Sequence, residues 1–127
     1  MRLRSGCELR SCLQLLLSEQ QLKAGCVLSG IGSLSTVQLR FAGQKTFTTL
    51  QGELEMLTLA GSLCAAGAHL HISVADHRGV VTGCHLGAGS LVRTTAELLV
   101  ALLRAWSFGR GLDAATGWQE MVIQPRA

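Results

Sequence analysis

Near the start of the chain, leucines at helical spacing predict the first element. Four of them share one helical face: Leu9, Leu13, Leu16 and Leu17. Ser5 stands three residues before Glu8, which is the spacing of a capping box. We therefore expect a helix from about residue 6 to residue 22. Lys23-Ala24-Gly25 should end it, because glycine tolerates the left-handed conformation of a helix stop.

The pattern then changes to an alternation with a period near two, which is typical of strands. Residues 26–41 predict two strands joined by a bend at Gly30-Ile31-Gly32, and residues 45–63 predict two more, parted near Gln51-Gly52. "TTAELLVALLRAW", residues 94–106, predicts a second amphipathic helix, and residues 118–124 a last short strand. The expected fold class is α+β, a largely antiparallel sheet covered by two helices, in a single domain over residues 1–127.

Composition narrows the class of protein. Hydrophobic residues make up 48% of the 127 residues and charged residues only 15%, which excludes a disordered chain and predicts a homo-oligomer that covers apolar surface. The net charge is +3 and the eleven Lys and Arg are scattered without a basic run, which makes nucleic acid a doubtful partner. Five cysteines without a C-x-x-C spacing fit reduced thiols in the cytoplasm. We expect no export signal and no membrane span.

All four histidines lie within "HLHISVADHRGVVTGCHL", residues 69–86, which predicts a hairpin. Residues two apart on a strand point to the same side, so His69 and His71 share a face. If Gly79 closes a three-residue loop after Asp76, His71 stands directly opposite His85. The same register pairs Leu70 with Leu86 and Ile72 with Cys84 on the other face, whereas His77 falls in the turn.

Three neutral imidazoles on one face suit zinc or another divalent first-row metal. His69, His71 and His85 are therefore candidate metal ligands. They could equally line a subunit interface or a polar pocket that holds no ion. For catalysis, Glu55 and Glu97 are candidate bases or further ligands, and Asp113 is a third carboxylate. No nucleophile elbow, phosphate loop or dinucleotide-binding motif is present.

A family resemblance follows from segments that keep their order along nearly the whole chain. They are "RLRSGCELRSCL", "AGCVLSGIGSLSTVQLRF", "GELEMLTLAGSL", "HLHISVADHRGVVTGCHL", "TTAELLV" and "FGRGLDAATGWQEM". In this order they resemble the PPC domain, the plants and prokaryotes conserved domain, although Cys84 stands where the family usually has a second glycine. The resemblance implies an α+β fold around an antiparallel sheet, a homotrimer, and a histidine-bound metal as in bacterial relatives. Plant members carry an R-G-R-P AT-hook, which this chain lacks, so we expect a stand-alone, bacterial-type member.

Three hypotheses about function follow. The first is a trimeric binding or regulatory module with a histidine metal site. The second is a metal-dependent enzyme of unknown substrate that uses His69, His71 and His85. The third is DNA binding through the trimer surface, which would weaken steeply with salt.

Overall fold

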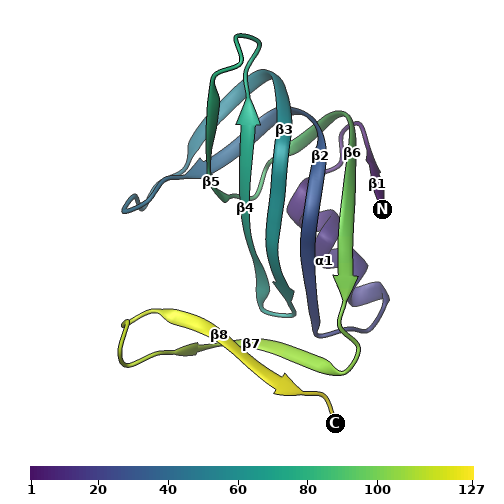
Figure 1. Ribbon diagram of the computed structural model, residues 1–127, viewed down its shortest axis with the longest axis vertical. Helices are drawn as coiled ribbons and strands as arrows, with labels where there is room; N and C mark the ends of the chain where they lie inside the picture. The colour runs from purple at the N-terminus through teal and green to yellow at the C-terminus, as the bar shows by residue number, and fades with distance from the viewer.

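A curved antiparallel sheet dominates the computed structural model, which describes residues 1–127 (Figure 1). Its strands are β1 (Arg2–Arg4), β2 (Ala24–Arg40), β3 (Thr48–Cys64), β4 (Gly67–Ala75), β5 (Val81–Leu86) and β6 (Leu91–Leu102). They lie in the order β1-β6-β2-β3-β4-β5, and the end of β2 also pairs with β5 through Leu39–Leu86 and Arg40–His85. This extra pairing bends the sheet toward closure at one end.

Two further strands, β7 (Trp106–Leu112) and β8 (Gln119–Pro125), form a hairpin of their own below the main sheet in Figure 1. Phe108 of β7 packs against Ala24 and Cys64 in a small buried cluster. Lys23 and Ser107 form an isolated bridge that joins the hairpin to the start of β2. The hairpin is therefore held against the end of the sheet where β3 turns into β4.

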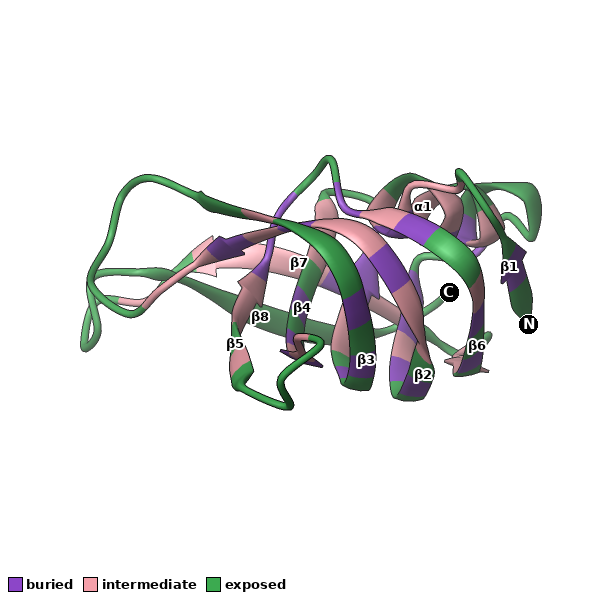
Figure 2. Cartoon of the chain, turned by 90° about the horizontal axis from the view of Figure 1, so that it is seen from above, coloured by how far each residue is buried: buried purple, intermediate pink, exposed green.

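The helix α1 (Leu9–Glu19) covers one face of the sheet, and the core lies between them. Leu9, Leu13 and Leu17 are at most 2% exposed. Buried positions on the strands alternate with exposed ones, as the bands in Figure 2 show. Burial of each such leucine contributes about 1.5–3 kcal/mol, so the layer between helix and sheet stabilises the fold. The helix is too short to cross a lipid bilayer, and it is the structure's one α-helix.

Both ends of the first helix differ from the prediction. Glu8 is itself the N-cap: its carboxylate accepts hydrogen bonds from the backbone N–H of Ser11 at 2.7 Å and of Arg10 at 3.4 Å. The left-handed residue after the helix is Gln21, with φ 52°, whereas Gly25 lies inside β2. The helix is shorter than predicted because a capping carboxylate and an early turn end its hydrogen-bond pattern at each side.

The predicted second helix over residues 94–106 is wrong, because this segment forms β6 and the start of β7. From Ala96 onward, the buried Ala96 and Leu98 alternate with Glu97 and Leu99, and Leu99 is 62% exposed. Because the exposed position 99 also carries a leucine, the hydrophobic residues do not alternate with polar ones as they do in most strands. The sequence pattern therefore resembles that of a helix. The fold is thus a largely antiparallel sheet with one helix.

The predicted breaks at Gly30-Ile31-Gly32 and Gln51-Gly52 are also wrong. β2 and β3 are each continuous over 17 residues. Shifts of register, such as the one between Leu34 and Thr36, bend β2 without ending it. Glycine here permits close strand approach: a Cβ on Gly32 would lie 2.4 Å from the carbonyl oxygen of Thr95.

Candidate metal centre

The hairpin from β4 to β5 has the register that the sequence predicted. The Asp76 N–H donates to the Val80 carbonyl at 3.0 Å, and Asp76 Oδ1 accepts the N–H groups of Arg78 and Val80. Gly79 has φ 79°, which glycine adopts without strain. The pairing that follows sets Ile72 opposite Cys84. It also sets His71 opposite His85, which ends the pairing between the two strands.

Three imidazoles meet at the end of this pairing. Their candidate ligand nitrogens all lie within 4.8 Å of one another. The Nε2 atoms of His69 and His71 are 3.2 Å apart, and the His71 and His85 ring centroids are 4.3 Å apart. Tetrahedral zinc with Zn–N bonds of 2.0–2.1 Å needs neighbouring nitrogens about 3.3 Å apart. The His69–His71 spacing matches this value, and the three histidines together could hold a first-row metal ion, whereas His77 is an exposed turn residue.

Neighbouring strands place arginines beside this cluster. Arg40 of β2 pairs with His85, and Ser62 of β3 pairs with His69. Arg110 of β7 donates to the Ser62 hydroxyl at 3.4 Å, which brings its guanidinium to the other side of the histidines. The centre therefore lies between two permanent positive charges.

These surroundings favour neutral imidazoles. Partial desolvation lowers the pKa of His69, and the positive charges on Arg110, His71 and Arg40 lower it further, against an opposing effect of Glu120. Partial desolvation also lowers the pKa of His85, followed by the charges on His71 and Arg40. Because a metal binds the neutral ring, protons compete less strongly at these two positions.

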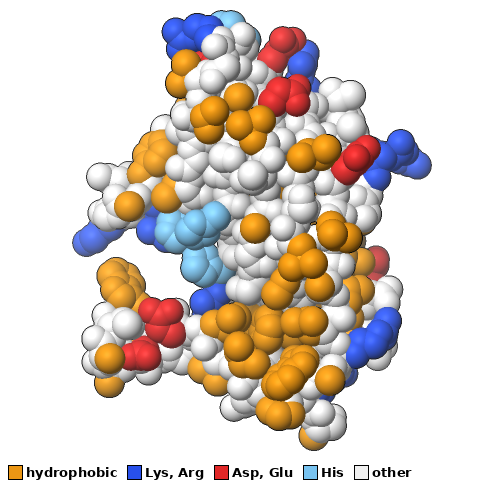
Figure 3. Space-filling view, in the orientation of Figure 1, with side chains coloured by type: hydrophobic (Ala, Val, Ile, Leu, Met, Phe, Trp, Pro, Cys, Tyr) orange, Lys and Arg blue, Asp and Glu red, His pale blue; other side chains and the backbone are white.

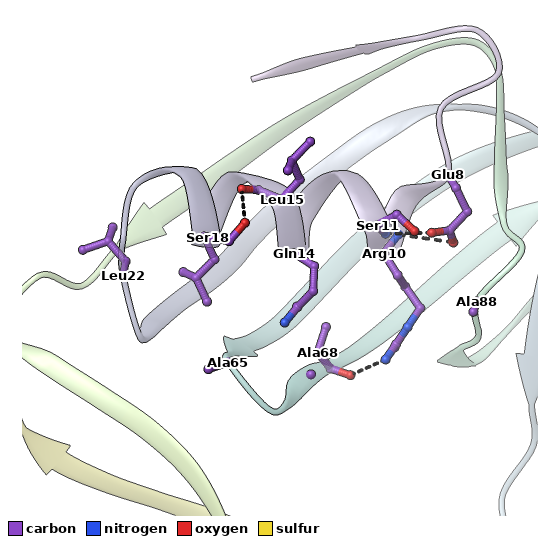
Figure 4. A pocket seen from close by; sticks show the side chains of 12 residues that line it. Glu8, Arg10, Ser11, Gln14, Leu15, Ser18, Leu22, Ala65, Ala68 and Ala88 are labelled. Atoms are coloured by element: carbon purple, nitrogen blue, oxygen red, sulfur yellow. Dashed lines mark hydrogen bonds between the residues drawn. The ribbon is translucent and has the colours of Figure 1, made fainter.

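Arg10 of α1 links the two strands that carry the histidines. Its Nη1 donates to the Leu86 carbonyl at 2.9 Å, and its Nη2 donates to the Ala68 carbonyl at 2.8 Å. Figure 4 shows this side chain extending from the helix to Ala68. Ala68 precedes His69 and Leu86 follows His85, so one guanidinium holds both flanks of the cluster where strand pairing has ended.

A cavity of about 920 Å³ opens beside the histidines, between the main sheet and the β7–β8 hairpin. Figure 3 shows the histidine side chains at the edge of this hollow, with basic side chains near them. Its charged lining residues are Arg10, Arg40, Lys45, Arg110 and Glu120, together with His69 and His85. Of the ionisable residues that line the cavity, the sequence singled out only the histidines, because the others come from segments far apart along the chain.

The carboxylates proposed for catalysis do not lie at the centre. Glu55 pairs with Ala75, five residues along β3 from the partner of His71, or about 16 Å at the rise of a strand. Glu97 lies on β6, and β2 and β3 separate it from β4. Asp113 instead accepts the N–H groups of Ala115 and Thr116 in the β7–β8 turn. The enzyme hypothesis therefore loses its proposed bases, and Glu120 is the carboxylate of the cavity.

Curated sequence relatives match nearly the whole chain. A protein from Synechococcus called bifunctional protein GlmU is 47% identical over 127 residues, which is 100% of this chain and 20% of that protein. The chain thus spans about a fifth of the length of the curated relatives it matches.

Solved structures agree as well. A hypothetical protein from Salmonella cholerae-suis superposes with a TM-score of 0.96 at 40% identity, covering 100% of this chain and 92% of that one. A metal-containing protein from Archaeoglobus fulgidus has a TM-score of 0.74 at 25% identity, covering 96% and 90%. A Ralstonia eutropha protein with a suggested DNA-binding role has a TM-score of 0.78 at 23% identity, covering 96% and 88%, which shows the fold alone.

The family assignment rests on most of the chain. The family model for the Plants and Prokaryotes Conserved (PCC) domain matches residues 1–104, which takes in the main sheet, the helix and all three clustered histidines. This is the family that the sequence motifs resembled under the name PPC, and the chain belongs to it.

Proposed function

We propose that this protein is a trimeric binding module whose His69, His71 and His85 hold zinc or another divalent first-row metal ion. The observation that carries the proposal is the convergence of three imidazole nitrogens within 4.8 Å. The metal-containing relative from Archaeoglobus fulgidus supports it, because it shares this fold. A bound ion would supply positive charge and Lewis acidity at the wall of the cavity.

The metal site is tested by elemental analysis of protein purified without chelator, followed by zinc titration of the chelator-treated protein. We expect about one zinc per chain in the wild type and less than a tenth of that in His71→Ala, because two imidazoles seldom retain the ion. His77→Ala is the matched control, since His77 is the exposed histidine of the turn, and it should bind zinc like the wild type. Equal zinc binding by His71→Ala and the wild type would disprove the site.

The trimer is proposed from the outer face of the sheet. Hydrophobic side chains gather there over the lower parts of β2, β3 and β6 and continue onto the β7–β8 hairpin, as Figure 3 shows. The exposed ones are Leu28, Ile31, Leu57 and Leu99, which are 44–62% exposed. A contiguous apolar face of this kind marks a contact between proteins, and a second and third copy of the chain would cover it.

Light scattering coupled to size-exclusion chromatography tests the trimer. We expect a particle of three times the 13.4 kDa chain mass for the wild type. Leu99→Glu should shift the protein toward monomer, because it places a charge in the apolar contact. Val81→Glu changes a similarly exposed residue on β5 and serves as the control. A monomeric wild type would contradict the proposal.

A further inference from the structure

The cavity beside the histidines has more features than a metal site needs. Its volume of about 920 Å³ is that of a small-molecule pocket, whereas an ion held by three imidazoles occupies only its edge. Its walls come from β2 and the loop after it, from the β3–β4 connection, and from the β7–β8 hairpin.

The charged groups of the cavity fit an anion. Four cationic side chains, Arg10, Arg40, Lys45 and Arg110, line it against one carboxylate, that of Glu120. Arg10 is occupied, since it donates to two backbone carbonyls. The remaining three cations suit a doubly charged group better than a single carboxylate, because each added charge increases the attraction.

The guanidinium groups of Arg40 and Arg110 keep most of their N–H donors available for a ligand. Arg40 donates one bond to the Gln44 carbonyl and Arg110 one to the Ser62 hydroxyl, each at 3.4 Å. A guanidinium has five N–H donors in a planar fork that matches the oxygens of a phosphate. Both side chains are half-buried, so their charges are less screened than those on an open surface.

An aromatic residue lines the same cavity. Trp118 lies in the β7–β8 connection and is 74% exposed. Its backbone is fixed, because its carbonyl accepts the Asp113 N–H at 2.9 Å and its N–H donates to the Thr116 hydroxyl at 3.3 Å. An exposed indole on a fixed backbone offers a surface on which a planar ring can stack, which is worth about 1–3 kcal/mol for a nucleobase.

We propose that this cavity binds a phosphate monoester that carries a planar ring, the chemistry of a nucleoside monophosphate. The phosphate lies among Arg40, Lys45 and Arg110, and the ring stacks on Trp118. The inference rests on the proposed function in two ways: it takes the protein to be a binding module, and it takes an ion at the histidines to add positive charge beside the ligand. The arginines and the tryptophan do not depend on that ion.

Calorimetry and tryptophan fluorescence with adenosine 5′-monophosphate test the inference. Adenosine provides the ring without the phosphate, and ribose 5-phosphate provides the phosphate without the ring. We expect the monophosphate to bind at least about tenfold more tightly than either fragment, because tenfold corresponds to about 1.4 kcal/mol, which lies within the range of a stacked base and of charged hydrogen bonds. Binding no tighter than that of adenosine would overturn the proposal.

Variants locate the ligand within the cavity. Arg110→Gln should weaken monophosphate binding about tenfold, and Trp118→Ala should reduce it toward the affinity of ribose 5-phosphate. Arg104→Gln makes the same charge change at an exposed position outside the cavity and should leave binding unchanged. If Arg110→Gln lowers the melting temperature, Lys45→Gln in the exposed loop gives the same test. Equal affinities of the cavity variants and Arg104→Gln would refute the site.

Titrations of chelator-treated and zinc-loaded protein separate the two proposals. Monophosphate binding without any zinc binding leaves the inference standing and removes the metal site. Zinc binding without monophosphate binding in either state overturns the inference and leaves the metal site standing. With both sites present, zinc should tighten monophosphate binding, because the ion adds positive charge beside the phosphate.

Discussion

Replacing Arg10 tests whether one guanidinium holds the histidine cluster together. Arg10→Met keeps much of the apolar stem and removes both hydrogen bonds, those to Leu86 at 2.9 Å and to Ala68 at 2.8 Å. Hydrogen bonds from a charged donor are worth about 1.5–3 kcal/mol each, and water can replace part of this at a half-buried position. The free energy of unfolding should therefore fall by about 2–3 kcal/mol.

Metal binding should weaken in the same variant, by about tenfold, because the flanks of His69 and His85 are then free to separate. Urea denaturation of chelator-treated protein, at one fixed protein concentration, measures the stability change. Competition with a zinc-binding dye measures the affinity. Arg104→Met is the control, since Arg104 is exposed in the turn before β7. An Arg10→Met protein that matches Arg104→Met in both assays would refute the positioning role of Arg10.

Two further predictions concern the strands around the centre. Gly61→Ala should lower the free energy of unfolding by at least about 2 kcal/mol, because Gly61 has φ 145° and its new Cβ would lie 2.0 Å from the His69 carbonyl oxygen. Gly43→Ala, at φ 73° with no neighbour within 4 Å, should cost only about 1 kcal/mol in the same urea experiment, and equal losses would show that the clash is unimportant. In chelator-treated protein, stability should fall as the pH drops below about 6.5, because unfolded histidines take up protons before His69 and His85, whose pKa values folding lowers. The loss should level off once the rings in the folded protein are protonated. Urea titrations between about pH 7 and pH 4.5 measure it. If the free energy of unfolding of a double His69→Ala, His85→Ala variant falls with pH as steeply as that of the wild type, the loss does not come from these histidines.

The histidine hairpin was predictable because its determinants are local. Asp76 and Gly79 fix the turn, and the strand period of two then sets His71 opposite His85 without reference to the rest of the molecule. The first helix was predictable for the same reason, since its leucines are spaced for one face. Its ends were less so, because Glu8 and Gln21 compete with Ser5 and Gly25 for the capping roles.

The segment of residues 94–106 shows where local pattern failed. Its apolar residues fit a helix as well as a strand, because the outer face of the sheet also carries leucines such as Leu99. Pairing of β6 with β2 on one side and β1 on the other decides in favour of the strand. Such pairing depends on residues about 65 to 95 positions away, and tertiary context then overrides helix propensity.

By itself, therefore, the sequence determined the family, the sheet-dominated class and the shared face of His69, His71 and His85. Only the tertiary structure decided what surrounds them. Arg40 comes to the cluster because the end of β2 pairs with β5, and Arg110 because the β7–β8 hairpin docks against the sheet. Arg10 of the helix donates to the backbone carbonyls of Ala68 and Leu86, which flank the cluster. Local periodicity and turns fix neighbours within a hairpin, whereas the charges that tune the centre come from segments brought together when the chain buries its core.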